Sequence, residues 1–294
     1  MSLQNQHKQA QQALYDAHLL DDLAAGAGTF GFRKPKLLRD LAFARWLARL
    51  ELKSGEQVLD VGCNAGARLE ALRREYGIEG TGIDLSPKTI ALGQKHFPAL
   101  TLQVGDAELL PYQENSFDTV ISFETFEHLP NPGKALAEIG RVVRPGGWVL
   151  IYAISRRNAG TWHWLQSKLS GGRLGTGALR DHLPELLVPP ECFPAWSQKA
   201  GLKIQQRGLL HQFFTLLHDE PWSAFLATLA PKRSRPRLDT IKMAGNLPRA
   251  PGKFFMLYRV WLHGMEIVMS LLDLPWQMAR VSDGIFVLLK KQEL

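Results

Sequence analysis

Glycine and acidic residues follow three short apolar runs of this sequence, and their types suit the binding of a nucleoside. The segment Asp60–Gly66 (DVGCNAG) follows the first run and opens a predicted helix. Its glycines, Gly62 and Gly66, would let a ligand approach the backbone closely. Asp84 ends the second run, where a carboxylate can accept hydrogen bonds from both hydroxyls of a ribose. Asp106 follows the third run, where another acid can accept from the amino group of a purine.

The first of these turns argues against a dinucleotide-binding fold, which needs the pattern G-x-G-x-x-G. The chain has Gly62, Asn64 and Gly66, followed by Ala67 and Arg68, so the third glycine is missing. Each turn or acid taken alone could serve local geometry or cap a helix. The ordered series favours a single ligand that contacts all of them, and a nucleoside satisfies the three positions at once.

Seven apolar runs predict the strands that position these residues, and helical patterns separate most of them. Such alternation predicts an α/β fold with a mainly parallel seven-stranded sheet and helices on both faces. We expect the last strand to run antiparallel beside the sixth. In parallel sheets of this kind, ligands bind outside the carboxyl ends of the strands. The predicted strands are 57–61, 80–84, 101–104, 117–123, 148–154, 202–209 and 284–290.

The predicted helices lie at 36–50, 67–75, 135–143 and 190–200, and another begins at Pro87 with Ser86 as its N-cap. A turn at residues 145–147 (PGG) is expected to lead into the fifth strand.

The last two predicted strands are separated by about 70 residues, which is too long for a hairpin loop. We therefore expect an inserted helical cap at 211–281 that sets substrate specificity. Residues 55–210 and 282–294 would form the ligand-binding domain, and residues 1–54 an N-terminal helical segment.

Four stretches of the sequence resemble the successive motifs of class I S-adenosylmethionine-dependent methyltransferases. The resemblance is nearest to the small-molecule branch that includes quinone and sterol methylating enzymes. It covers residues 55–155 closely, and residues 178–210 and 283–291 loosely. It implies a Rossmann-like fold and S-adenosylmethionine as the cofactor. The stretches are VLDVGCNAGARLEAL, GIDLSPKTI, GDAELLPYQENSFDTVIS and RVVRPGGWVLI.

By this resemblance, Gly62 and Gly66 approach the methionine part of the cofactor, Asp84 holds the ribose, and Asp106 with Ala107 faces the adenine. Asn64 stands at a position where the family more often has glycine. This substitution affects only the geometry of the turn. The full set of cofactor-binding residues that we expect is Asp60, Gly62, Asn64, Gly66, Asp84, Leu85, Asp106 and Ala107.

The reaction that the resemblance implies is an in-line displacement on a sulfonium methyl group, for which the protein mainly positions a nucleophile. If the nucleophile is a hydroxyl, a general base helps. His128, after the fourth strand, is the first candidate, with Glu124 and Glu127 as weaker ones; His128 could instead be an ordinary helix-start or surface residue. Arg180 and His182 are candidate acceptor-binding residues because loops in this region often cover the site of similar enzymes.

Composition sets further bounds on the class of protein. The chain has 294 residues, a net charge of +7 and two cysteines, Cys63 and Cys192, so a disulfide scaffold and a four-cysteine zinc site are excluded. We expect no metal. The first 20 residues lack the apolar core of a signal peptide, and no uncharged run is long enough for a conventional membrane span. These features favour a cytoplasmic protein.

The segment 254–273 carries apolar residues all round except for one narrow polar stripe, which predicts a helix buried on several sides. Burial in the protein core, in a homodimer contact or in a lipid interface all remain open. A basic run at 232–237 precedes it, and a balance of +9 over 156–280 contrasts with −4 over 53–155. The pairing of a basic run with an apolar helix suits an anionic membrane surface.

We therefore expect S-adenosylmethionine-dependent methylation of a small amphiphilic or lipid-linked acceptor, with O-methylation favoured, and peripheral contact with the inner face of a membrane. A nucleic-acid partner is not expected, because no appended RNA-binding motif and no tetrapeptide for a flipped base is present. Two alternatives stay open: a soluble sugar or glycan acceptor, and a non-catalytic nucleoside-binding or scaffold protein.

Overall fold

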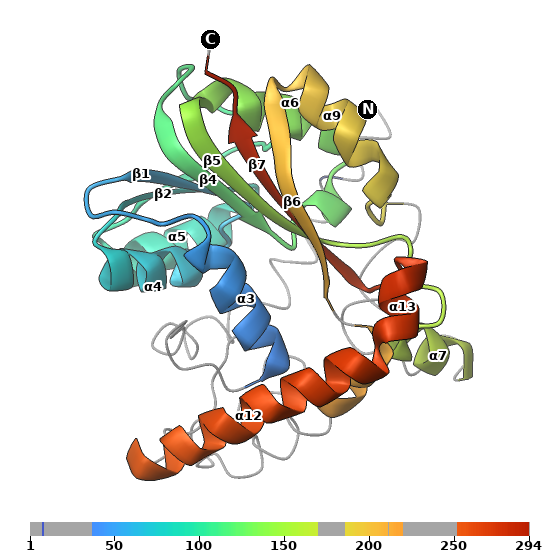
Figure 1. Cartoon of the computed structure of the whole chain (residues 1–294). Coiled ribbons are helices and arrows are strands. Elements are labelled where there is room, and N and C mark those ends of the chain that lie inside the picture. Colours follow the sequence, from blue (N-terminus) through green and yellow to red (C-terminus); the bar gives the residue numbers. More distant parts are fainter. Residues whose placement is uncertain (1–7, 9–36, 170–185, 211, 220–251, 294) are drawn as a thin grey trace.

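A seven-stranded sheet forms the centre of the molecule, with the strand order β3-β2-β1-β4-β5-β7-β6 (Figure 1). The computed structural model describes residue 8 and residues 37–169, 186–210, 212–219 and 252–293. Five strands pair in parallel, whereas β7 runs antiparallel between β5 and β6. The predicted fold class, including the antiparallel last strand beside the sixth, is confirmed.

The strands lie close to their predicted ranges. The largest difference is at the start of β5, where the predicted turn at residues 145–147 lies inside the strand. Gly146 has a φ of +75°, and the pairing with β4 shifts register between Phe117 and Thr119. The turn residues therefore make an irregularity in one long strand, because pairing to β4 begins before them. The strands are β1 (Gln57–Val61), β2 (Glu79–Asp84), β3 (Thr101–Val104), β4 (Phe117–Phe123), β5 (Val143–Ile154), β6 (Leu202–Leu210) and β7 (Gly284–Lys291).

The helices that cover the sheet begin where the local sequence allows. Gly66, with a φ of +79°, precedes α4. The Ser86 hydroxyl accepts the N–H of Thr89 at 3.2 Å at the start of α5, which confirms the predicted N-cap. The helices are α3 (Leu38–Ala48), α4 (Ala67–Tyr76), α5 (Pro87–His96), α6 (Pro132–Val142), α7 (Trp162–Leu169), α9 (Phe193–Lys199), α12 (Gly252–Leu272) and α13 (Leu274–Ala279), with short 3-10 turns η1 (Phe126–His128) and η2 (Pro190–Cys192).

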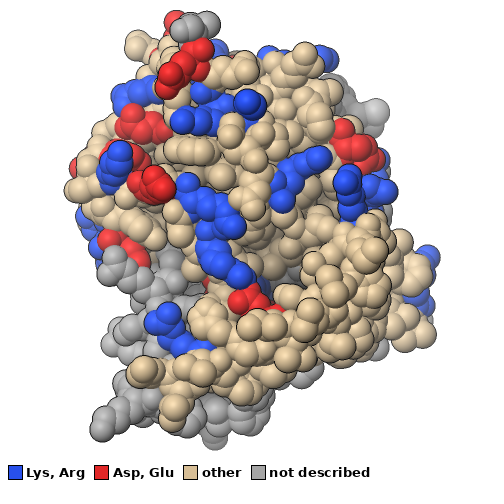
Figure 2. All heavy atoms as spheres, in the orientation of Figure 1, with Lys and Arg blue, Asp and Glu red and all other residues tan. Residues whose placement is uncertain are grey.

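The long helix α12 is not buried on several sides within the chain, so of the three predicted kinds of burial the protein core does not apply. Its inner side packs Leu262 against Leu38 and Leu41 of α3, and its outer side faces solvent as a broad band without charged residues (Figure 2). The helix is apolar all round, and among the described elements α3 packs on one side of it. The large apolar side chains on α12 and α13 that are 40–84% exposed are Met256, Leu257, Val260, Trp261, Ile267, Val268, Leu271, Leu272, Leu274 and Met278.

Two buried carboxylates fasten this helical layer to the rest of the protein. Asp273, which lies between α12 and α13, is fully buried and accepts the N–H groups of Phe214 and Thr215 at 2.7 and 2.9 Å. Asp219 accepts the N–H groups of Leu38 and Arg39 at the start of α3. Both carboxylates thus cap a helix that belongs to another part of the chain. Of the helices described, none has both the length and the apolar character needed to cross a bilayer.

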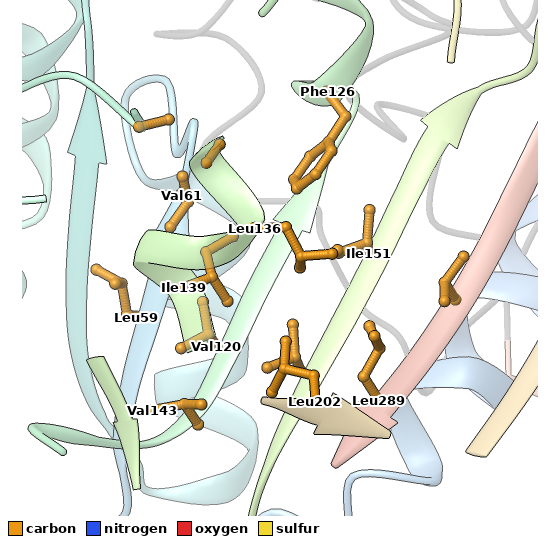
Figure 3. Packing of buried hydrophobic residues seen from close by; sticks show 14 of the residues in the cluster. Leu59, Val61, Val120, Phe126, Leu136, Ile139, Val143, Ile151, Leu202 and Leu289 are labelled. Atoms are coloured by element: carbon orange, nitrogen blue, oxygen red, sulfur yellow. The ribbon is translucent and has the colours of Figure 1, made fainter. Parts of the chain in front are cut away.

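The core consists of two apolar layers, one on each face of the sheet. Val120 and Ile121 are neighbours in β4 and belong to opposite layers, because successive strand residues point to opposite faces. Figure 3 shows the layer under α6, where Leu136 and Ile139 pack on Val120 and neighbouring strand residues. Burying such a side chain contributes about 1.5–3 kcal/mol. Both layers hold the carboxyl ends of the strands in fixed positions.

Candidate functional site

The turn after β1 has a backbone that only small residues fit. Gly62 has a φ of +77°, and a Cβ placed there would lie 2.1 Å from the Thr125 hydroxyl oxygen. Asn64, at a φ of +52°, also adopts the left-handed conformation, in which asparagine is tolerated better than most residues. Its side-chain oxygen accepts the N–H of Ala65 at 2.7 Å. The turn therefore keeps its glycine-like shape although asparagine replaces the commoner glycine.

Asp60 is a buried acid at the carboxyl end of β1. Its side chain is 1% exposed, and in the described part of the chain neither carboxylate oxygen has a hydrogen-bond partner. Burial raises the pKa of Asp60 to about 6, although Arg68 acts in the opposite direction. A buried carboxylate without a donor is costly, so this position calls for a ligand that brings a cation or an N–H group.

Asp84, at the end of β2, is held beside the same turn. One carboxylate oxygen accepts the N–H of Asn64 at 2.9 Å, and the other accepts the N–H of Ser86 at 3.0 Å. Burial raises the pKa of Asp84, and these hydrogen bonds oppose the shift. Hydrogen bonds from Leu85 and Thr89 act on the same carboxylate, so the turn surrounds Asp84 with donors. Leu85, which follows, is partly exposed.

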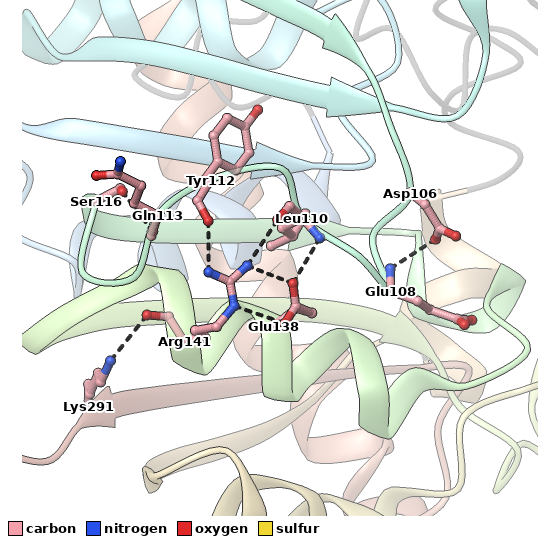
Figure 4. Close-up of polar contacts among 9 residues, drawn as sticks. All are labelled: Asp106, Glu108, Leu110, Tyr112, Gln113, Ser116, Glu138, Arg141 and Lys291. Atoms are coloured by element: carbon pink, nitrogen blue, oxygen red, sulfur yellow. Dashed lines mark hydrogen bonds and ion pairs between the residues drawn. The ribbon is translucent and has the colours of Figure 1, made fainter.

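Asp106 lies in a loop that α6 holds in place (Figure 4). The Arg141 guanidinium donates to the carbonyl oxygens of Tyr112 and Leu110 at 2.7 and 2.9 Å, and Glu138 accepts the N–H of Leu110 at 2.9 Å. Hydrogen bonds from Arg141 lower the pKa of Glu138, so the pair stays charged. The loop after β3 is therefore fixed relative to the sheet, and Ala107 is buried beneath it.

Lys8 is an unexpected neighbour of Asp106. Its ammonium nitrogen lies 2.6 Å from one Asp106 oxygen and 3.3 Å from a Glu108 oxygen. The other Asp106 oxygen accepts the N–H of Glu108 at 2.9 Å. A lone lysine near the N-terminus, 98 residues from its partner, carries no local sequence signal. Lys8 thus donates to the carboxylate that is expected to accept from the purine amino group.

The predicted acceptor side lies after β4. Glu124 has a φ of +56° and donates its N–H to the carbonyl oxygen of Tyr152 on β5 at 2.9 Å. Glu127 and His128 form the following turn, with Glu127 fully buried and His128 partly buried. Burial, with Glu124 nearby, raises the pKa of Glu127 to about 8. Glu127 is therefore mostly a neutral acid at pH 7, which makes it a poor general base there.

A carboxylate–imidazole pair at the neighbouring strand ends was missed by the sequence interpretation. Nδ1 of His163, in α7, lies 2.5 Å from a carboxylate oxygen of Asp283, the residue before β7. The other oxygen of Asp283 accepts the Thr161 hydroxyl at 2.6 Å. All three residues are at most 5% exposed. The pair joins residues 120 positions apart, so no spacing within a motif could have revealed it.

The structure thus brings the expected residues to one edge of the sheet, after β1, β2, β3 and β4. Arg180 and His182 lie outside the described residues, as does the basic run 232–237. Over the described ranges, no three His, Cys, Asp or Glu side chains are placed to hold a metal ion.

The comparisons with known proteins agree with this arrangement. A family model described as a methyltransferase domain matches residues 59–151. A ubiquinone biosynthesis O-methyltransferase of Albidiferax ferrireducens is 37% identical over 117 residues, which cover 38% of this chain and 46% of that protein. The protein of the same name from Xanthomonas euvesicatoria is 29% identical over 230 residues, or 74% of this chain and 91% of its own. The chain spans about half the length of several curated relatives that it matches.

Solved structures support the fold. The complex between the Haloferax volcanii Trm112 methyltransferase activator and a putative methyltransferase contains a chain that superimposes with a TM-score of 0.56. That likeness covers 96% of this chain and 98% of the other at 19% identity, a level that speaks for the fold alone. Residues 59–151 of this chain thus match a methyltransferase domain, and the sheet around them has the fold of this solved structure.

Proposed function

We propose that this protein transfers a methyl group from S-adenosylmethionine to a hydroxyl of a small amphiphilic or lipid-linked acceptor. The observation that carries the proposal is the orphaned carboxylate of Asp60 beside a glycine turn, in series with Asp84 and Asp106 at one edge of the sheet. The O-methyltransferases among the relatives support oxygen as the methylated atom.

The residues present fit this cofactor. Its methionine part carries an ammonium group, which matches the need of Asp60 for a cationic donor. Asp84 ends β2, at the position where a carboxylate can accept hydrogen bonds from ribose hydroxyls. Asp106 can accept from the adenine amino group once Lys8 moves from it. Gly62 keeps the turn compact beside these acids, since a Cβ there would collide with the Thr125 side chain. When bound, the cofactor supplies an activated methyl group on a positively charged sulfur.

The protein's part in the reaction is to position the acceptor and to take its proton. His128 and Glu124 remain the candidates that the sequence suggests. The His163–Asp283 pair is a third, since a carboxylate on Nδ1 fixes an imidazole in the tautomer that can accept a proton on Nε2. The raised pKa of Glu127 keeps that carboxyl mostly neutral at pH 7, so it is not among these candidates.

Calorimetric titration with S-adenosylhomocysteine tests the cofactor assignment. We expect Asp84→Ala to weaken binding by about 2–4 kcal/mol, because each charge-assisted hydrogen bond contributes about 1.5–3 kcal/mol and the two are not fully additive. Asp118→Ala is the matched control, since Asp118 caps the other end of β1 by accepting the N–H of Gln57. Unchanged affinity in Asp84→Ala, with the fold intact, would contradict the proposal.

A scaffold that binds the nucleoside without catalysis would pass the titration but transfer no methyl group. Incubation with the radiolabelled cofactor and pools of lipids, quinones and glycans separates these cases. We expect label in the organic phase; label confined to water-soluble glycans would favour the soluble-acceptor alternative.

A further inference from the structure

The outer side of the last two helices is the largest apolar surface that the folded chain leaves without an explanation. We define the α12–α13 face by the ten exposed apolar side chains of these helices given above. Five of them are at least 63% exposed: Met256, Leu257, Val260, Ile267 and Met278. Contiguous apolar surface of this kind on a protein marks an interaction site.

Packing against α3 buries the side of α12 that is opposite to this face. Tyr258, Leu262, Met265 and Met269 lie against the two leucines of α3, and Asp273 caps the helix at 213–219. Of the face, Trp261 contacts the rings of His218 and Tyr258, whereas the other exposed residues lie outside the buried cluster with α3. Their apolar character therefore calls for a partner outside the fold.

The charges around the face are cationic. In the described residues 256–280, the exposed charged side chains are Arg259 and Arg280. The two acids of this segment add little negative charge to the surface, since Glu266 pairs with Arg45 and Asp273 is buried. Beyond α13, the exposed cations Arg156, Arg157 and Lys168 continue the positive border. A face with this border attracts an anionic surface and would repel a second copy of itself in a two-fold dimer.

The face also lies at the edge of the sheet where the site is. The Ser282 N–H donates to the carbonyl oxygen of Arg157 at 2.9 Å, and the Trp276 indole donates to that of Gly160 at 2.7 Å. Both acceptors belong to the segment that follows β5. Figure 1 shows α12 and α13 running across this end of the sheet. A surface bound to the face would therefore be next to the acceptor side of the site.

We propose that the α12–α13 face docks on an anionic lipid bilayer, with α12 parallel to the surface, so that the acceptor enters the site from the membrane. The second half of this statement rests on the proposed function. The 21 residues of α12 extend over about 30 Å. Its apolar side chains can enter the headgroup region while Arg259 and Arg280 reach lipid phosphates. Trp261, 40% exposed, suits the same depth.

Flotation of the full-length protein with vesicles tests the docking directly. We expect it to float with phosphatidylcholine vesicles that contain 30% phosphatidylglycerol, and not with pure phosphatidylcholine. Ile267→Gln/Leu271→Gln should lower the partition at least tenfold, whereas Val104→Gln/Leu109→Gln, which changes two exposed apolar residues elsewhere, should not. Arg259→Gln/Arg280→Gln should lower it about fivefold for each cation. Lys203→Gln/Arg207→Gln on the exposed part of β6 is the charge-matched control.

Failure to float with anionic vesicles at low salt, equal flotation with neutral vesicles, or an equal loss in the control variants would overturn the proposal. Light scattering on the same samples tests the competing occupant, a second copy of the chain. If the protein is a dimer, Ile267→Gln/Leu271→Gln dissociates it and no flotation is seen, the face would be assigned to the second copy. Titration of each preparation with S-adenosylhomocysteine is independent of these results, so a failure of the cofactor assignment is distinguished from a failure of docking.

Discussion

Replacing the buried acid Asp60 by asparagine should stabilise the protein without ligand and weaken cofactor binding. In the folded chain, burial raises the pKa of Asp60 from 3.8 to about 6. Each unit of pKa corresponds to about 1.4 kcal/mol, so the ionised carboxylate costs the fold about 3 kcal/mol. The folded state holds this proton more tightly than the unfolded state does. The cost is therefore absent below pH 4, grows as the pH rises, and is complete above pH 6.

Removing the carboxylate of Asp60 should therefore stabilise the protein most at the pH values where this carboxylate is ionised. Asp60→Asn should raise the free energy of unfolding at pH 7.5 by as much as about 3 kcal/mol, and by little at pH 4. Urea denaturation at both pH values measures the difference. Asp118→Asn is the control, because Asp118 is partly exposed and hydrogen-bonded to Gln57 and Arg144. That variant should gain no stability at either pH.

The same carboxylate sets the pH dependence of ligand affinity. At pH 5 about one tenth of Asp60 is ionised, so the wild-type protein should bind S-adenosylhomocysteine about tenfold more weakly than at pH 7.5. In Asp60→Asn, most of this dependence should disappear, and affinity at pH 7.5 should fall by about 1.5–3 kcal/mol with the loss of a charge-assisted hydrogen bond. An unstabilised variant that keeps the wild-type pH profile would refute the reasoning.

Two further predictions concern the frame of the site. Asp283→Asn should lower the free energy of unfolding by about 1–3 kcal/mol in chemical denaturation, because Thr161 and His163 lose an anionic partner in a buried place; no change would remove the pair from any positioning role. Gly62→Ala should cost more stability than Gly55→Ala, since both glycines have a positive φ but a Cβ meets a threonine side chain only at the former. Equal melting temperatures for these two variants would contradict that contrast.

The sequence predicted the strands well because each of them is a short buried run with its own turn residues. The bounds of β1, β3 and β4 match those of the structure, and β5 differs because pairing continues through its glycines. The cofactor-side residues were predictable for the same reason, since Gly62, Asp84 and Asp106 each follow a strand directly. Parallel strands bring such positions to one edge without any long-range information.

What the sequence could not provide are contacts between distant segments. Lys8 meets Asp106, and His163 meets Asp283, through folding of the whole chain. The pattern of α12 predicted burial because apolar residues surround it, but burial also requires elements to pack against. The structure has α3 on one side of α12, and the side chain of Leu262 is buried there while that of Ile267 is 63% exposed.

The buried acids at the carboxyl edge of the sheet favour a positively charged ligand over a neutral one. Burial raises the pKa values of Asp60 and Asp84, so the fold without ligand bears the cost of their ionisation at pH 7. A ligand with a cationic group relieves part of that cost, and its binding should stabilise the protein by linkage. The ammonium group of the methionine part is such a cation, and S-adenosylhomocysteine carries it as well, so binding of the product should also stabilise the protein.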